Sequence, residues 1–226
     1  MKKTTFYTEL AFFIGLALLA LGTALTAYGD VGISMVVAPA YVLHLYVSQL
    51  LPWFSFGIAE YVLQAVVLLI LIIILRKAKW TFLLSFGVTV LYGVLLDASM
   101  ALTALLPANL FIQIPTYIVG AIICCSALAL LFCSYFPPEA YELFSKEIAA
   151  KFNKPVHKIV NIYNIGSLIL SLVLSLIFFG GIKGIGIGTV ACAFLYGFVI
   201  NFFQKVYGKL FDFKDKLPWR ERFEKG

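Results

Sequence analysis

Residues 85–97, SFGVTVLYGVLLD, return in a related form at residues 189–201, TVACAFLYGFVIN. The two stretches align at a constant offset of 104, so that Leu-Tyr-Gly falls on Leu-Tyr-Gly and Asp97 falls on Asn201. Small or polar residues recur at every fourth position of both copies, which places them on one slowly drifting stripe of a helix. Leu, Val, Ile and Phe fill most other positions. Each copy therefore predicts a membrane helix with a narrow face against which another helix packs closely.

The rest of the chain is as apolar as these two stretches. Of its 226 residues 62% are hydrophobic and only 12% are charged, which is more apolar surface than a soluble domain of this size can hide. A Lys2-Lys3 start resembles a signal peptide, but the hydrophobicity continues along the whole chain, so we expect the first apolar run to be a span. Six runs are long enough to cross a bilayer: 10–29, 56–75, 80–105, 110–136, 157–179 and 185–207.

Two further segments are predicted not to span. Residues 138–153 alternate apolar and charged side chains at helical spacing, which is typical of an amphipathic helix at the membrane interface. Residues 33–52 are apolar enough for a seventh span, but the positive charges favour six. With six spans and a cytoplasmic N-terminus, sixteen of the seventeen Lys and Arg residues lie inside and only Lys183 lies outside, whereas seven spans place fourteen inside at best.

The repeat supports the same topology. At an offset of 100, Tyr41 falls on Tyr141 and Gln64 falls on Asn164, so residues 33–52 correspond to residues 138–153. We therefore interpret residues 33–52 as a re-entrant or interfacial helix on the outer side. Each half then holds three spans, and because three is odd the second half enters the membrane upside down.

The predicted fold class is an all-α polytopic membrane protein with six transmembrane helices in two inverted three-helix repeats, each with an interfacial or re-entrant helix. Both termini are predicted to be cytoplasmic. The predicted units are residues 1–107 for the first repeat, 108–207 for the second, and 208–226 for a basic cytoplasmic tail.

This order of elements, the repeated Leu-Tyr-Gly with Asp97 and Asn201, and the Gly-rich start of the last span, GIGIGT at residues 184–189, resemble the YczE/YyaS/YitT family of bacterial integral membrane proteins. The resemblance covers residues 10–207. The chain departs from the family pattern in lacking a clear Gly-Pro turn after the first span. The resemblance implies a multi-pass protein of the bacterial cytoplasmic membrane and names no substrate.

Two carboxylates, Glu60 and Asp97, lie well inside predicted spans. A charge at the centre of a membrane helix costs roughly 2.5–3.5 kcal/mol on insertion scales, so each must face protein or water, be protonated, or hold a cation. The plainer alternatives are that Glu60 reaches the interface and that Asp97 is satisfied by Ser99, Thr103 or a neighbouring backbone group.

The fifth span carries a polar stripe that runs for almost its full length. Either a tight helix interface or a water-accessible path explains such a stripe. The amide side chains of this stripe, together with Asn201, would line the inner half of the membrane. The outer half would bear Glu60, Gln64 and Asp97. The stripe consists of Asn161, Asn164, Ser167, Ser171 and Ser175. Tyr92 and Tyr196, from the repeated motif, complete the candidate set for binding a substrate or an ion.

Several function classes find little support in the sequence. The four cysteines lie inside apolar runs without CxxC spacing and the two histidines lie far apart, so we expect no disulfide, no metal site and no cofactor. No nucleophile and base stand at a usable spacing, so we expect no enzyme. The positive residues sit at the ends of spans, where membrane orientation explains them better than nucleic-acid binding does.

Two functions remain. The first is a small secondary transporter or permease for a small polar solute or an ion, with Asp97 as its main ionisable residue and the substrate held at the interface of the repeats. The alternative is a non-transporting accessory protein that docks a partner through residues 138–153 and the basic tail. The lipid bilayer is the expected environment of either, and a homo-oligomer is compatible with both.

Overall fold

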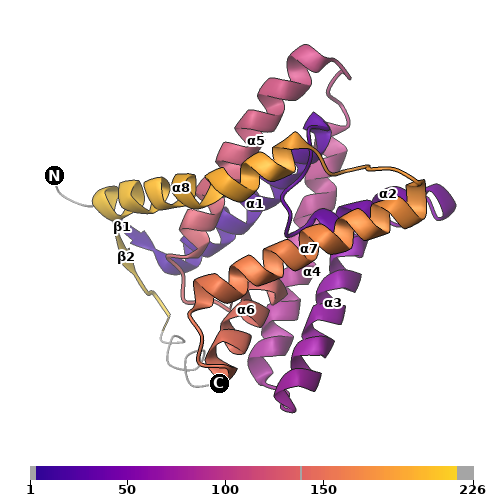
Figure 1. Ribbon diagram of the computed structural model, residues 1–226. Coiled ribbons are helices and arrows are strands. Elements are labelled where there is room, and N and C mark those ends of the chain that lie inside the picture. Colours follow the sequence, from indigo (N-terminus) through magenta and orange to yellow (C-terminus); the bar gives the residue numbers. More distant parts are fainter. Residues whose placement is uncertain (1–3, 138, 218–226) are drawn as a thin grey trace.

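The computed structural model describes residues 4–137 and 139–217, and helices make up most of this part of the chain (Figure 1). Six of the helices described there are long and apolar enough to cross a membrane, which confirms the predicted fold class at that level. They are α1 (Thr8–Gly29), α3 (Phe56–Leu75), α4 (Trp80–Thr103), α5 (Leu110–Leu131), α7 (Val156–Phe179) and α8 (Ile187–Leu210). Two shorter helices, α2 (Ala38–Leu50) and α6 (Ala140–Lys151), occupy the segments predicted not to span.

The segments before the first helix and after the last one lie side by side. β1 (Thr4–Tyr7) and β2 (Phe211–Lys214) form a parallel ladder. The backbone N–H groups of Lys216 and Leu217 donate to the carboxylate of Glu9 at the start of α1, at 2.9 and 2.8 Å. Because β1 leads directly into α1 and β2 directly follows α8, the chain starts its first long helix and finishes its last one in the same place.

The most extensive helix contact is that of α1 with α5, and glycine makes it possible. Positions on α5 fall in number as those on α1 rise, so the two helices are antiparallel. A Cβ added to Gly22 would lie 2.9 Å from the carbonyl oxygen of Gly120, and one added to Gly120 would lie 2.9 Å from that of Gly22. The backbones therefore touch where they cross, as small residues permit in membrane helices. Along this contact Gly15, Gly22 and Gly29 lie against Ala127, Gly120 and Tyr117.

The short helix α6 packs along α3 in a parallel sense. Its first residue, Ala140, donates its N–H to Gln64 in the middle of α3, and its last residue, Lys151, donates to the carbonyl oxygen of Ile74 near the end of α3. At about 1.5 Å per residue, α6 therefore covers only the second half of α3.

The apolar side of α6 is buried against neighbouring helices. We predicted an amphipathic helix lying at the interface, but α6 instead packs against α3, α4 and α7. Leu143 and Ile148 of α6 join the cluster formed by Leu68 and Leu71 of α3. The amphipathic pattern arises because the charged residues at the start of α6 face a cavity, and because Glu147 forms an ion pair with Lys79 at 2.8 Å near its end.

The helix α2 is placed in a similar way in the other half. Its first turn is buried, and the helix packs against α7 and α3. The ring of Tyr46 stacks on Phe178 with the centroids 4.3 Å apart, near the end of α7. Both short helices therefore begin inside the protein, α2 beside α7 and α6 beside α3.

Replacing Gly22 with alanine should weaken the contact between α1 and α5. The new Cβ would lie 2.7 Å from Sγ of Cys124 and 2.9 Å from backbone atoms of α5, so the helices must separate. We expect the free energy of unfolding to fall by about 1–3 kcal/mol, and thermal unfolding in detergent measures this loss. The control is Gly87→Ala on α4, where nothing lies within 4 Å of the added Cβ. Equal melting temperatures for the two variants would contradict the close crossing.

Candidate functional site

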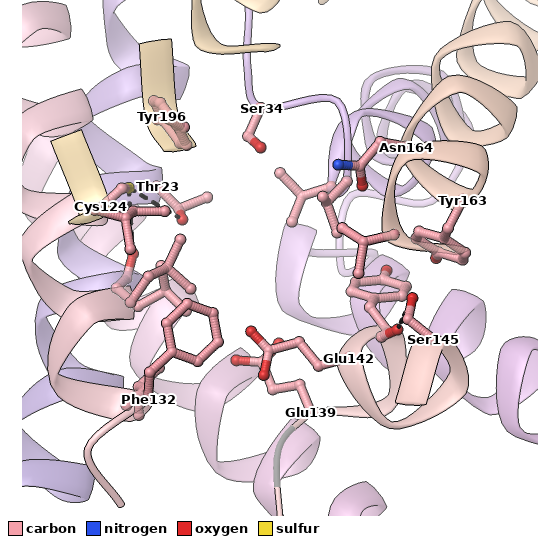
Figure 2. Close-up of a pocket in the computed structure, with 18 of the residues that line it drawn as sticks. Thr23, Ser34, Cys124, Phe132, Glu139, Glu142, Ser145, Tyr163, Asn164 and Tyr196 are labelled. Atoms are coloured by element: carbon pink, nitrogen blue, oxygen red, sulfur yellow. Dashed lines mark hydrogen bonds between the residues drawn. The ribbon is translucent and has the colours of Figure 1, made fainter. Parts of the chain in front are cut away.

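A cavity of about 400 Å³ lies between two walls of helices. Figure 2 shows Tyr196 and Cys124 on one side, from α8 and α5, and Tyr163 and Asn164 of α7 on the other. The segment just before α2 also lines the cavity, and so does the start of α6 with the glutamate that precedes it. The cavity is therefore surrounded by residues from both halves of the chain.

The structure brings four of the predicted residues to the wall of the cavity. They are Tyr92, Asn161, Asn164 and Tyr196. The hydroxyl of Tyr92 donates to that of Thr23 at 3.1 Å, which ties α4 to α1 inside the protein. The tyrosines of the repeated Leu-Tyr-Gly thus face one cavity, as their equivalence suggested.

A polar cluster lies next to this cavity, and Gln64 is at its centre. The hydroxyl of Thr89 donates to Oε1 of Gln64 at 2.5 Å, and the backbone N–H of Ala140 donates to the same oxygen at 3.1 Å. A backbone N–H can only donate, so these two bonds fix the orientation of the amide. The amide nitrogen must point the other way, toward two carboxyl groups.

The two carboxyl groups are those of Glu60 and Glu139. Nε2 of Gln64 donates to Oε2 of Glu60 at 3.1 Å and to Oε2 of Glu139 at 3.3 Å. The hydroxyl of Tyr141 donates to Oε2 of Glu60 at 2.8 Å. The other oxygen of each carboxyl group, Oε1, is buried and has no hydrogen-bond partner among the described residues. Glu60, for which we considered a position near the interface, is completely buried here.

The electrostatics of the cluster are unbalanced. In the described part of the chain the ion pairs are Lys79 with Glu147 and Lys214 with Asp212, and neither involves this cluster. Burial raises the pKa of the Glu139 carboxyl, and the nearby negative charge of Glu60 raises it further, against the hydrogen bond from Gln64. Glu139 lies just outside the spanning helices, and its protonated form is favoured there.

Two residues of the site, Glu139 and Glu142, were not predicted from the sequence. Both lie at the start of a helix assigned to the membrane interface, where carboxylates are solvated and need no partner. In the structure the side chains of both glutamates reach the cavity (Figure 2). The alignment of Tyr41 with Tyr141 carried the relevant signal, because it equated this helix with one that we already considered re-entrant.

Asp97 belongs to α4, and its side chain lies away from the cavity, beside the start of α3. Its carboxylate accepts hydrogen bonds from the hydroxyl of Ser55 at 2.6 Å and from the N–H of Gly57 at 2.8 Å. Ser55 in turn accepts from the N–H of Ile58, so Asp97 completes the N-terminal cap of α3. Asp97 is not part of the cavity wall, and Asn201, its counterpart, is exposed and does not line the cavity either.

The polar stripe on α7 divides into two parts. Asn161 and Asn164 reach the cavity, whereas the serines bond locally. Ser171 donates to the carbonyl oxygen of Leu168, and Ser175 accepts from the N–H of Lys183 at 2.7 Å in the loop after α7. The stripe therefore combines residues of a cavity wall with serines that bond the helix's own turn and the following loop.

No group of three or more His, Cys, Asp or Glu side chains within residues 4–137 and 139–217 could hold a metal ion. The four cysteines are free. One of them, Cys192 of α8, lies 3.1 Å from the hydroxyl of Tyr117 of α5, so it contributes to the packing of the cavity wall.

A comparison with known protein families gives a match over most of the chain. The model of DUF6198, a family of unknown function, matches residues 6–205, which include all eight helices of the described chain except the last residues of α8. The chain belongs to this family. No curated protein and no solved structure matches it. Nothing in the match names the YczE/YyaS/YitT family, so that resemblance stays a prediction.

Replacing Asp97 with alanine should destabilise the protein through α3. The change removes the acceptor of the Gly57 N–H and of the Ser55 hydroxyl, at a cost of about 1–3 kcal/mol. The matched control is Asn201→Ala at the equivalent position of the repeat, which is exposed and should cost less than about 0.5 kcal/mol. Thermal unfolding in detergent compares the two variants. An Asp97→Ala protein as stable as the wild type would contradict the capping role.

Proposed function

We propose that the protein is a small permease that carries a polar solute or an ion through its central cavity. One observation carries this proposal. The cavity is lined by the segment that leads into α2 and by the first turn of α6, so both short helices begin at it. Broken or short helices that start at a central site, with the positive ends of their dipoles facing it, are typical of secondary transporters.

The helix contacts support two inverted repeats, one on each side of residue 107. If the two halves are exchanged, α1–α4 becomes α5–α8, α2–α7 becomes α6–α3, and α2–α3 becomes α6–α7. All six of these contacts occur in the structure. The contact of α1 with α5 maps onto itself, and there the two helices are antiparallel, as an inverted repeat requires.

Two contacts break this correspondence and favour transport. α4 packs against α3 and α6, whereas α8 makes almost no contact with their counterparts, α7 and α2. α7 and α8 instead form opposite walls of the cavity (Figure 2). Two related halves in unequal states are expected of alternating access, in which a second state would exchange the two arrangements. The cavity would then open on the side of α3 and α4.

The accessory-protein alternative loses one of its two docking elements. It relied on the amphipathic helix of residues 138–153, and most of the apolar residues of α6 are buried against α3 and α7. A buried face is not available to a partner protein. Of the basic tail predicted at residues 208–226, residues 208–217 form the end of α8, the strand β2 and the segment bonded to Glu9, and residues 218–226 lie outside the described residues.

A label placed on the cavity wall should block transport. In a variant without the four native cysteines, Ala193→Cys introduces a thiol on the exposed cavity side of α8. The matched control, Phe198→Cys, is also on α8 and exposed but does not line the cavity. A thermal-shift screen of purified protein against metabolites and ions first identifies a solute, and uptake is then measured in proteoliposomes. Maleimide should abolish uptake by the first variant alone, and equal sensitivity would contradict a pathway through the cavity.

The proposed location is the bacterial cytoplasmic membrane with both termini in the cytoplasm. Sixteen of seventeen Lys and Arg residues fall on the cytoplasmic side in this orientation. In intact cells, an impermeant thiol reagent should label single cysteines placed at Asp30 or Lys183 and should spare those at Lys77 or Lys154. The reverse pattern would invert the topology.

A further inference from the structure

We propose that Glu60 and Glu139 form a proton-binding site that couples proton movement to the permease function proposed above. The two glutamates come from different parts of the chain. Glu60 lies in the second turn of α3, and Glu139 is the residue just before α6. Glu139 lines the cavity, and Glu60 lies behind it with no exposed surface. The pair therefore joins the cavity to the packing of α6 on α3.

The two carboxyl groups lie too close together for both to carry a negative charge. Both carboxyl groups receive a hydrogen bond from the same nitrogen of Gln64, so they are close neighbours. The start of α6 contributes a partial positive charge of about half an elementary charge, which cannot balance two carboxylates. Like charges that share a buried site do not both remain ionised, and one carboxyl group takes up a proton.

One oxygen of each carboxyl group has no hydrogen-bond partner among the described residues. Oε1 of Glu60 and Oε1 of Glu139 are buried and unpartnered within the described chain, although the other oxygen of each group is well bonded. Each free oxygen is a position where a proton can reside. Since a buried polar atom without a partner is costly, this arrangement indicates a ligand that comes and goes.

The ligand is a proton because the oxygens are too few for a metal ion. A hard cation such as calcium takes six to eight oxygen ligands, and Mg²⁺ takes six. Here Oε1 of Gln64 already accepts two hydrogen bonds, and the hydroxyl of Tyr141 is a donor to Glu60. Only the two free carboxyl oxygens are left, which suits a single proton.

The other titratable groups around the pair supply no direct counter-charge. α6 presents Tyr141, Glu142 and Lys146, and Lys146 acts on Glu142. α4 presents Tyr92 and α7 presents Tyr163, both neutral phenols. On α2, Tyr41 and His44 contact Phe56 in the first turn of α3 instead of the pair.

Proton binding would act on the contact between α6 and α3. When both carboxyl groups are ionised, their repulsion pushes the start of α6 away from α3. A proton taken up from cavity water removes that repulsion, and its release to the cavity restores it. Because α6 begins at the cavity, the position of this helix links the proton to the solute.

The first test is the pH dependence of the melting temperature of the purified protein. The pKa of Glu139 is raised in the folded protein, so folding favours the protonated pair. Stability should be greatest near the ordinary carboxyl pKa of about 4.3 and should fall as the pH rises from there through the raised value. Glu139→Gln keeps the shape and removes the titration, so its melting temperature should vary less with pH than that of the wild type. Glu147→Gln on the same helix should keep the wild-type slope.

A measurement on the wild type keeps this test independent of whether the variant folds. The infrared C=O stretching band of protonated carboxyl groups should be present at neutral pH and should disappear on alkaline titration. Absence of that band at neutral pH, or identical pH slopes for wild type and Glu139→Gln, overturns the proton site.

A second experiment separates this proposal from the permease function. Proteoliposomes loaded with pyranine, a pH-sensitive dye, report proton entry under an imposed pH gradient with and without the solute found by the thermal-shift screen. Solute-dependent proton entry that is lost in Glu139→Gln and kept in Glu147→Gln supports coupling. Solute uptake without proton entry overturns the coupling but leaves the permease, whereas a titrating pair in a protein that moves no solute overturns the permease but leaves the proton site.

Discussion

The contact of α1 with α5 at Gly22 and Gly120 holds the two halves of the molecule together. Its backbones touch, so a side chain at either position would separate the helices. Each of these helices also packs against the last helix of its own half, α1 against α4 and α5 against α8. In lipid, where apolar side chains gain nothing by leaving their surroundings, such close backbone packing supplies much of the attraction between helices. The cavity lies beside this contact and depends on the spacing that it sets.

The short helices impose a second constraint, because a helix that starts inside a membrane protein must satisfy its first N–H groups without water. α6 solves this with a side chain, since the N–H of Ala140 is bonded to Oε1 of Gln64. That bond turns the nitrogen of Gln64 toward Glu60 and Glu139. The same glutamine therefore completes a helix start and joins the two carboxyl groups, which is why structure and proposed chemistry meet at one residue.

Hydropathy and charge were enough to predict the spans, because lipid allows few alternatives for an apolar run of about 20 residues. Each of the six predicted spans forms a helix long and apolar enough to cross a membrane, with ends that differ by a few residues, and the two segments predicted not to span form shorter helices. Half of the candidate site also followed from sequence, since Glu60 and Gln64 were singled out as polar residues inside a span. Glu139 could not be found in this way. Its burial depends on how deeply α6 sits against α3, and an amphipathic pattern is the same for a helix at the interface and for one whose polar side faces a cavity.

The same limit explains Asp97. A carboxylate in an apolar run is costly wherever it sits, so the sequence indicates that it has a partner but not which one. In the structure the partners are the N–H of Gly57 and the hydroxyl of Ser55, which belong to the first turn of a neighbouring helix. Helix capping and ion binding use the same carboxylate oxygens, and only the three-dimensional position separates the two roles.

The repeat shares its framework between the halves but not its chemistry. At the offset of 100, Gln64 corresponds to Asn164, while Glu60 corresponds to Val160 and Glu139 to Pro39. Pro39 has no N–H, so the start of α2 has one donor fewer to satisfy. Val160 lines the cavity where a second carboxyl group would otherwise stand. In the proposed inverted repeat the carboxyl pair is therefore single although the helices come in twos, and the proposed exchange of the two halves would move the walls of the cavity around one fixed charged site.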